Sequence, residues 1–487
     1  MEHQRSLRGA FASLYAIVVA IALPAQTLTT LHNFNMKNGN YPAGMLQATD
    51  GNLYGITNSG GPSNNGTIFR ITPGGAFATV YNFCSLSSCA DGSVPTGMIQ
   101  ATDGNLYGTT STGGANNIGT VFKLTLSGAL TTLYSFCTKN TCPGGNVPQE
   151  GLVEGADGNF YGTTFYGGPD PSGIGYGGVF KITPGGKLTS LYYFCTLSKC
   201  ADGYYPLGGL VQTSNGDFYG TTSNGGSYAP YDGTIFKITP NGTLTTLYSF
   251  NCSKSGCAMG GQPHAGLTLA SNGELYGTTM VGGKPAPFTG GTVFAITTGD
   301  MLTTLNSFCN SAGCPQGDSV QAPLIQGSDG NLYGTSTVNG TSNGGAVFSV
   351  TPNGALATVY SFCFGKQCTG GYYPDGGLVQ ATNGDFYGTT SRGGTHFAGT
   401  IFRLSTGLKP FVTARPAFGK AGAPVRIQGT NLTGATRVTF NGVAADFTVV
   451  SASLIITAVP SGATPGRFQV VIPSGTLSSN AAFQALP

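Results

Sequence analysis

The feature that most constrains this chain is the segment DGNLYGTT at residues 103–110, which recurs in recognisable form seven times. The copies begin at Asp50, Asp103, Asp157, Asn215, Asn272, Asp329 and Asn383. Successive copies therefore start 53 to 58 residues apart. A period of this length indicates one supersecondary unit that packs against its neighbours. The sequence thus predicts one large repetitive structure rather than several unrelated domains.

Each repeat unit has the pattern of four short strands. In the third unit the predicted strands are residues 151–156, 159–164, 177–183 and 187–194. The pair Asp157-Gly158 predicts a two-residue hairpin turn, because both residues tolerate positive φ. With 80 Gly and only 8% charged residues, the composition also favours short strands joined by tight turns. Four antiparallel strands in each repeat are typical of a propeller blade.

The fourth strands indicate how the repeats are arranged. Segments like LTTLYSF begin at Leu28, Phe77, Leu130, Leu188, Leu244, Leu302 and Leu356. The last unit ends with residues 400–405 and has no fourth strand of its own, whereas a surplus copy lies at residues 28–34. We therefore expect an all-β fold, a seven-bladed β-propeller closed by the N-terminal strand. Such closure removes an exposed sheet edge that would favour aggregation.

The two ends of the chain differ from the repeats. Residues 1–25 predict a signal peptide: Arg5 and Arg8 precede an apolar run at 11–23 that is short for a membrane span. Cleavage is expected after Ala25, with Ala22 as the alternative, and an uncleaved anchor helix is the other interpretation. The propeller takes residues 26–408. Residues 409–487 predict a small β-sandwich of short strands, with a hairpin at Asn441-Gly442.

Twelve cysteines form six pairs with four residues between the members of each pair. The pairs are Cys84 with Cys89, Cys137 with Cys142, Cys195 with Cys200, Cys252 with Cys257, Cys309 with Cys314, and Cys363 with Cys368. In an exported chain this pattern predicts six local disulfides, each pinning one loop. Zinc ligands usually come in CxxC-type pairs supported by a second pair or by His, and the chain has only four His. The sequence therefore predicts no metal site.

Charge and hydropathy exclude two classes of partner. The formal net charge is +3, and the charged residues are dispersed. This balance argues against nucleic acid as a partner and against an electrostatic membrane interaction. No stretch after residue 25 is apolar enough to predict a membrane span in the mature chain. We expect a secreted, extracellular or cell-surface bacterial protein.

Two segments carry family resemblances. The unit GLVQATNGDFYGTTSRGGTHFAGTIFRL at residues 377–404 and its copies resemble the GloVer tandem repeats of bacterial exported proteins. The C-terminal segments RPAFGKAGAPVRIQGTNLTGATRVTFNGVAADFTVVS and VPSGATPGRFQVVI resemble an IPT/TIG domain, which has an immunoglobulin-like fold. These resemblances imply export and a surface or extracellular role, and they imply no defined reaction.

Strand order assigns the loops to two faces. The Asp-Gly and Pro-x-Gly turns share one face, and the Gly-rich and Cys-containing loops share the other. All length variation lies in the second set, so the face that bears it, hereafter the loop face, is the candidate functional face. Aromatic residues there could stack on sugar rings, although packing within the loops is the favoured interpretation. They are Tyr204, Tyr205, Tyr228, Tyr231, Tyr372 and Tyr373.

Three further sets of repeated residues have two interpretations each. A polar residue lies three positions before most of the Asp-Gly turns. These residues are a candidate ring around the central channel of the propeller. Hydrogen bonding between blades is favoured as their role over contact with a ligand. The ring consists of Gln47, Gln100, Glu154, Gln212, Gln326 and Gln380, with Leu269 in the remaining unit. The third strands carry cationic residues that could bind acidic sugars. The favoured interpretation is that the charged ends of these side chains lie in solvent. They are Arg70, Lys123, Lys181, Lys237 and Arg403. The DGN acids could bind calcium, but turn chemistry is favoured.

No catalytic motif, cofactor site or metal site is predicted, because the sequence contains no P-loop, GxSxG or HExxH. The sequence therefore favours a non-enzymatic exported protein for binding, adhesion or cell-envelope interaction, which presents disulfide-pinned loops to a glycan or another envelope polymer. The alternative is a secreted carbohydrate-active enzyme with acids at the mouth of the propeller channel. Glu150, Glu154 and Glu274 are the only glutamates after residue 25. Oligomeric state is not predicted.

Overall fold

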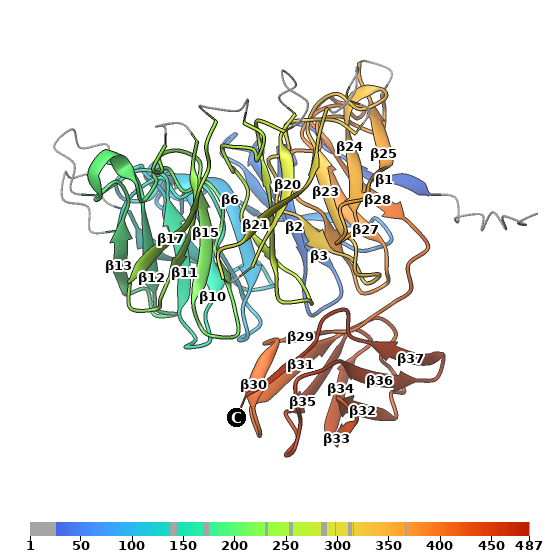
Figure 1. Cartoon of the computed structure of the whole chain (residues 1–487). Helices are drawn as coiled ribbons and strands as arrows, with labels where there is room; N and C mark the ends of the chain where they lie inside the picture. Colours follow the sequence, from blue (N-terminus) through green and yellow to red (C-terminus); the bar gives the residue numbers. More distant parts are fainter. Residues whose placement is uncertain are drawn as a thin grey trace, which may run out of the picture.

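The computed structural model describes residues 26–486, apart from 137–143, 169–174, 229–231, 253–256, 284–289, 298, 310–313, 315 and 366–367. The described chain is built from β-strands, with two short 3-10 turns, η1 (Ser87–Cys89) and η2 (Ser198–Cys200), and no α-helix (Figure 1). In this part of the chain no helix is long and apolar enough to cross a membrane. The predicted signal peptide, residues 1–25, lies outside the described residues.

Seven four-stranded antiparallel sheets occupy residues 27–405. The first three consist of β2 (Asn40–Gln47), β3 (Leu53–Ser59), β4 (Thr67–Ile71) and β5 (Phe77–Asn82); β6 (Ser93–Gln100), β7 (Leu106–Thr112), β8 (Thr120–Leu124) and β9 (Leu130–Ser135); and β10 (Val153–Glu154), β11 (Phe160–Thr164), β12 (Gly178–Ile182) and β13 (Leu188–Tyr193). The next three consist of β14 (Val211–Gln212), β15 (Phe218–Thr222), β16 (Thr234–Ile238) and β17 (Leu244–Ser249); β18 (Thr268–Leu269), β19 (Leu275–Thr279), β20 (Thr292–Ile296) and β21 (Leu302–Ser307); and β22 (Ile325–Gln326), β23 (Leu332–Ser336), β24 (Asn343–Val350) and β25 (Leu356–Cys363). In each sheet, strands that follow one another in sequence are neighbours.

The last sheet joins the two ends of the repeat region. It contains β26 (Val379–Gln380), β27 (Phe386–Thr390), β28 (Thr400–Ser405) and, at its edge, β1 (Thr27–Asn33). The surplus N-terminal copy thus supplies the fourth strand that the last unit lacks. Its antiparallel register places Leu28 opposite Leu404 and Asn33 opposite Thr400.

The Asp-Gly turn differs from the expected two-residue hairpin. In the third unit the Gly158 N–H donates to the Gly155 carbonyl oxygen at 2.9 Å, and the Gly155 N–H donates to the Asn159 carbonyl at 2.8 Å. Among the residues of this turn, only Gly158 has a positive φ, at 74°. The connection is therefore a longer loop that ends in one left-handed glycine, the geometry of a turn followed by a bulge. Asp157 does not have a positive φ. Its side chain instead accepts hydrogen bonds within the turn, as described below for Asp103.

The first strands of five units are shorter than the sequence predicts. In the third unit strand β10 has two residues, whereas the pattern predicts a strand over residues 151–156. The preceding glycines pack against the next segment instead of continuing a ladder. A Cβ atom on Gly208, for example, would lie 2.5 Å from the main-chain nitrogen of Gly266. Close backbone contact between neighbouring units thus replaces strand pairing at this point.

The core lies between neighbouring sheets. The tyrosine of the repeated motif is buried in every unit. Where the next unit has a phenylalanine at the facing position, the two rings are in contact, as for Tyr107 and Phe160 at 4.2 Å between ring centroids. The glycine after this tyrosine leaves room for a phenylalanine of the third strand, because a Cβ on Gly108 would lie 2.5 Å from Cζ of Phe122. Both faces of each sheet are therefore apolar, as expected for sheets with a neighbour on each side.

The C-terminal segment forms two further four-stranded sheets and a parallel pair. One sheet contains β29 (Thr413–Arg415), β31 (Pro424–Gln428), β35 (Leu454–Ala458) and β34 (Phe447–Ser451), and the other contains β33 (Val443–Ala445), β32 (Arg437–Phe440), β36 (Phe468–Ile472) and β37 (Gly475–Ser478). The pair is β30 (Phe418–Lys420) with β38 (Gln484–Leu486). The core of the C-terminal segment includes Val425, Ile427, Phe440 and Phe468. The expected hairpin at Asn441-Gly442 is present, with φ of 44° and 88°.

The C-terminal sheets pack against the face that bears the Asp-Gly turns, while the loops lie on the opposite side (Figure 1). Several hydrogen bonds fix this arrangement, and three of them involve main-chain carbonyl groups of Ala48, Thr49 and Thr382. Gln428 Nε2 donates to the Ala48 carbonyl at 2.7 Å, Ser453 Oγ donates to the Thr49 carbonyl at 2.9 Å, and the Phe411 N–H donates to the Thr382 carbonyl at 3.0 Å. The turn face, to which the sequence assigned no role, is therefore the docking surface for the C-terminal sheets.

Candidate functional site

The repeated DGN segment is part of the scaffold. Asp103 Oδ1 accepts a hydrogen bond from the Asn105 N–H at 2.9 Å, and Oδ2 accepts from Tyr107 Oη at 2.9 Å and Lys123 Nζ at 3.0 Å. Burial opposes ionisation of Asp103, but hydrogen bonds from Asn105, Lys123 and Tyr107 outweigh it and lower the pKa of this carboxyl to about 2. The carboxylate oxygens are thus occupied by donors of the chain itself. This is turn chemistry rather than a calcium site.

Three third-strand cations pair with acids of the repeat turns. Lys123 lies 3.0 Å from Asp103, Lys181 lies 3.9 Å from Asp157, and Arg403 lies 3.9 Å from Asp385. These three side chains remain 32%, 28% and 37% exposed, so they are solvated as favoured and also pair with an acid. The physical reason is strand pairing: Lys123 lies opposite Tyr107, so its ammonium group reaches the turn that precedes that tyrosine.

The candidate channel ring connects neighbouring sheets. Gln100 Oε1 accepts a hydrogen bond from the Thr49 N–H of the preceding unit at 2.9 Å, and its Nε2 donates to the Gly104 carbonyl of its own turn at 3.0 Å. All six ring residues accept a main-chain N–H in this way. The donors are Thr49, Thr102, Ala156, Ser271, Ser328 and Thr382, for Gln100, Glu154, Gln212, Gln326, Gln380 and Gln47 respectively. These are hydrogen bonds between neighbouring units, the interpretation favoured for this ring over ligand contact.

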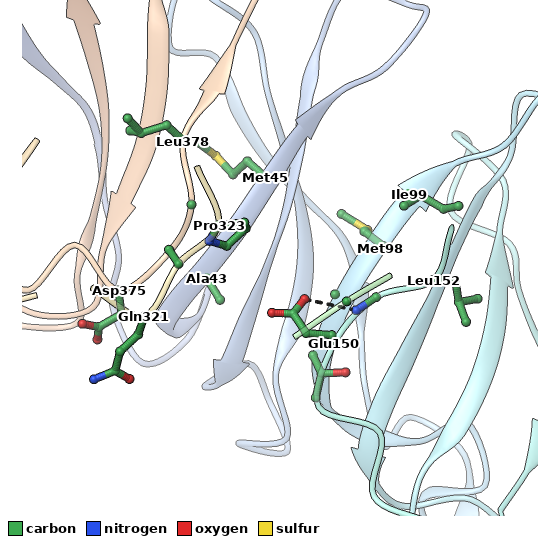
Figure 2. A pocket seen from close by; sticks show the side chains of 18 of the residues that line it. Ala43, Met45, Met98, Ile99, Glu150, Leu152, Gln321, Pro323, Asp375 and Leu378 are labelled. Atoms are coloured by element: carbon green, nitrogen blue, oxygen red, sulfur yellow. Dashed lines mark hydrogen bonds between the residues drawn. The ribbon is translucent and has the colours of Figure 1, made fainter. Parts of the chain in front are cut away.

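A cavity of about 330 Å³ lies among the segments that lead into the first strands. Its wall is mostly glycine and small apolar residues, because the segments approach each other closely: a Cβ on Gly97 would lie 2.6 Å from the nitrogen of Gly151. Three larger polar side chains interrupt this wall. Figure 2 shows Glu150 on one side of the cavity and Asp375 with Gln321 on the other. The structure thus gathers two carboxyl groups and an amide in one hollow.

Burial favours the neutral form of both carboxyl groups. Burial raises the pKa of Glu150 to about 7, although a hydrogen bond from the Gly151 N–H at 3.3 Å acts in the opposite direction. Asp375 is accessible from the cavity, but the surrounding wall desolvates it and raises its pKa, while hydrogen bonds with Ser391 and Thr337 oppose this shift. Near neutral pH the Glu150 carboxyl group can therefore both donate and accept hydrogen bonds.

Little in the sequence points to this site. Glu150 stands out there only as one of three glutamates, and Asp375 and Gln321 were missed. The one available signal is that all three occupy variable positions within segments that are otherwise rich in glycine, alanine and proline. Their meeting depends on units that are far apart in the chain.

Five of the six expected disulfides are present. They join Cys84 to Cys89, Cys195 to Cys200, Cys252 to Cys257, Cys309 to Cys314 and Cys363 to Cys368. The sixth expected pair consists of Cys137 and Cys142, and both cysteines lie outside the described residues. A disulfide between Cys137 and Cys142 therefore stays a prediction.

Two further observations concern the cysteine loops. Asp91 reinforces the first loop, because its Oδ2 accepts hydrogen bonds from the Ser85 N–H at 2.9 Å and from Tyr81 Oη at 2.8 Å. In the described part of the chain, Cys309, Cys314 and Asp318 are the one group close enough to share a metal ion. A disulfide occupies both sulfurs of that group, so these cysteines act as a cross-link.

Most of the loop-face tyrosines pack on other aromatic residues. Tyr205 stacks on Phe165 at 4.5 Å and meets Tyr204 edge-on at 4.7 Å. Tyr372 and Tyr373 meet edge-on at 4.9 Å. Tyr228 differs, since 61% of its surface is exposed. Tyr231 lies outside the described residues.

Comparison with solved structures concerns the fold alone. A fungal alcohol oxidase of the AA5 family, in complex with copper, has a TM-score of 0.52 at 12% identity, covering 95% of this chain and 99% of that chain. The extracellular domain of a hybrid two component system from B. thetaiotaomicron has a TM-score of 0.49 at 12% identity, covering 95% and 58%. PorZ, a surface component of the type-IX secretion system of Porphyromonas gingivalis, has a TM-score of 0.45 at 12% identity, covering 92% and 60%.

Comparison of sequences identifies the family. No curated protein matches the chain. The pattern of the Gloeobacter/Verrucomicrobia repeat matches residues 85–261 and 232–446, and that of the IPT/TIG domain matches residues 411–485. Both resemblances seen in the sequence are thereby confirmed. The chain belongs to the Gloeobacter/Verrucomicrobia repeat family and carries an IPT/TIG domain after its repeats.

Proposed function

We propose that the seven sheets are the blades of a closed seven-bladed propeller spanning residues 26–408. Two contacts between the first and last sheets support closure. The Thr382 N–H donates to Gln47 Oε1 at 2.9 Å, and Leu53 and Phe69 share a buried cluster with Tyr387 and Ile401. With β1 as the outer strand of the last blade, the ring has no missing strand.

Residues 409–487 form, in this proposal, a separate immunoglobulin-like sandwich that covers the turn face of the ring. Residues 1–25 direct export, and the mature protein acts outside the cell or at its surface. The five local disulfides support an oxidising compartment, because such bonds are rare in the reducing cytosol.

The proposed activity is binding of a glycan or a related envelope polymer at the loop-face mouth of the channel. The observation that carries it is the cavity containing Glu150, Gln321 and Asp375. First strands run from the loop face to the turn face, so the residues that precede them lie at the loop-face end. Carboxyl and amide groups there can exchange hydrogen bonds with sugar hydroxyls, while the C-terminal sheets occupy the other face.

A second candidate function is glycoside hydrolysis at the same mouth. It is favoured by the pKa of Glu150, which burial raises to about 7, and by the second carboxyl group of Asp375 across the cavity. Such a pair resembles the acid and base, or acid and nucleophile, of glycosidases. Glu150 would act as the general acid, because it retains its proton near neutral pH.

One experiment separates the two functions. Purified residues 26–487 are incubated with chitin, cellulose, xylan and peptidoglycan, and both retention on the polymer and release of reducing ends are measured. Binding predicts retention without release. Hydrolysis predicts release that Glu150→Gln abolishes. Neither retention nor release on any polymer contradicts both functions.

The control variant is Glu274→Gln. Glu274 lies at a repeat turn, where its carboxylate accepts hydrogen bonds from Asn272 and Tyr276, and it does not line the cavity. The substitution makes the same change of side chain outside the cavity, so a difference between the two variants reports on the cavity itself.

A further inference from the structure

A second hollow lies between the C-terminal sheets and the turn face of the repeats. This cleft has a volume of about 840 Å³, within the range of small-molecule sites. Leu152 and Leu210 of the repeats line one wall, and Phe418 and Leu486 of the parallel strand pair β30–β38 line the other. Among the described residues, the buried core clusters include neither Phe418 nor Leu486. Leu152 belongs to the core of the repeats and Leu210 packs against it, so Phe418 and Leu486 are the apolar side chains of the cleft that the core does not use.

Arg415, at the end of β29, is one of the charged residues that line the cleft. Its Nη1 donates to the Gln100 carbonyl at 3.0 Å, and Nη2 lies 3.5 Å from the Gln47 carbonyl. Across the part of the chain that the structure describes, no carboxylate lies within 4.0 Å of its guanidinium group. The half-buried cation therefore contacts only neutral carbonyl groups, and the Glu154 carboxylate compensates its charge only in part, from beyond 4.0 Å.

The neighbouring charges add to this imbalance. Arg426 lies directly opposite Arg415 in the β29–β31 ladder, where like charges repel. Lys420 also lines the cleft. The one acid on the opposite wall, within the described residues, is Glu154, and its carboxylate oxygens already accept hydrogen bonds from the Thr102 N–H at 2.9 Å and Oγ1 at 2.6 Å. The cleft thus combines an apolar surface with an excess of positive charge.

We propose that this cleft binds an anionic amphiphile, a molecule with a single carboxylate on an alkyl body. The carboxylate pairs with Arg415, whose guanidinium has five N–H donors and uses two of them on main-chain carbonyls. The alkyl body lies between Leu152 and Leu210 on one side and Phe418 and Leu486 on the other. The cleft shares Leu152 and Leu210 with the loop-face cavity, but Arg415, Phe418 and Leu486 do not line that cavity, so the proposal does not depend on the proposed glycan function.

The test is calorimetric titration of residues 26–487 with sodium decanoate, below its micelle concentration, and with 1-decanol as the uncharged probe. Saturable decanoate binding is expected. Arg415→Gln should weaken decanoate by about tenfold or more and leave 1-decanol within about twofold, since a charge-assisted contact is lost. Arg437→Gln is the matched control, because Arg437 is exposed on the far sheet. No saturable binding, equal affinity for the two probes, or an unchanged decanoate affinity in Arg415→Gln would overturn the proposal.

A second variant covers the case in which Arg415→Gln does not fold. Ala417 is exposed at the rim of the cleft, so Ala417→Trp fills the entrance without removing a contact of Arg415. Decanoate binding should then fall while the thermal unfolding temperature is retained. Full decanoate affinity in folded Ala417→Trp would place the ligand elsewhere and contradict the assignment.

Discussion

The main-chain N–H of Thr382 donates a hydrogen bond of 2.9 Å to Oε1 of Gln47, which joins two residues 335 positions apart in the chain. The same contact recurs between five other pairs of neighbouring units, and it is absent where Leu269 replaces the amide. The repeat thus provides its own matched set of variants for measuring what one such bond contributes.

Substitution of Gln47 by Leu should destabilise the protein. The Thr382 N–H is buried and would lose its acceptor, which costs about 1–3 kcal/mol. Leu269→Gln is the reverse change at the one position that lacks the bond, and it should be neutral or stabilise by about 0.5–1.5 kcal/mol. Urea unfolding of both variants checks the prediction. Equal midpoints for Gln47→Leu and the parent protein would show that this contact does not hold the ends of the repeat region together.

Removal of β1 should destabilise the repeats strongly. A chain that begins at residue 35 exposes the edge of β28 and loses Phe34, which is fully buried and by itself contributes about 2 kcal/mol. Thermal unfolding should begin at a much lower temperature, with aggregation through the exposed strand edge. The control is a chain that begins at residue 26. Identical melting curves for the two chains would refute ring closure by β1.

The disulfides should stiffen loops more than they stabilise the whole fold. Each joins cysteines five positions apart, so the double substitution Cys84→Ser and Cys89→Ser should cost no more than about 2 kcal/mol. Asp91 still holds the Ser85 N–H in that variant. Hydrogen exchange should therefore increase at residues 84–92 and not in β4 or β5. Non-reducing peptide mapping provides the independent check, also for Cys137 with Cys142, and bonds between different loops would contradict the assignment.

Glu150 should make stability depend on pH. Its folded pKa, about 7, lies above the value of 4.5 expected in the unfolded chain, so its contribution is fully present below pH 4.5 and is lost as the pH rises through 7. Glu150→Gln stays neutral throughout. At pH 8 it should be more stable than the parent by about 1–2 kcal/mol after solvent screening, and at pH 4 the difference should vanish. Unfolding midpoints at the two pH values test this, with Glu274→Gln as the control; a difference independent of pH would contradict it.

Local patterns predicted the repeats well. The fourth strands begin at or one residue before the predicted positions, from Thr27 to Leu356, because strand alternation and turn residues are properties of the nearby sequence. The hairpin at Asn441-Gly442 was predicted for the same reason. Short strands such as β30 and β38 were missed, because their parallel pairing joins residues more than sixty positions apart.

The site was harder to predict than the fold. Glu150, Gln321 and Asp375 come from the third, sixth and seventh units, and only the arrangement of the sheets brings them to one cavity. The docking of the C-terminal sheets was also missed. It rests on main-chain carbonyls, such as that of Ala48, which carry no sequence signal. Conversely, the repeated acids and cations were visible in the sequence but satisfy each other within the scaffold.

The most direct test of polymer binding is the retention of residues 26–487 on insoluble envelope polymers, compared with the double variant Glu150→Gln and Asp375→Asn. Both substitutions keep the shape of the cavity and remove its carboxyl groups. We expect that the parent and Glu274→Gln are retained on at least one polymer and that the double variant loses about tenfold or more in affinity. Retention that is equal in the double variant and the parent would contradict binding at the loop-face mouth.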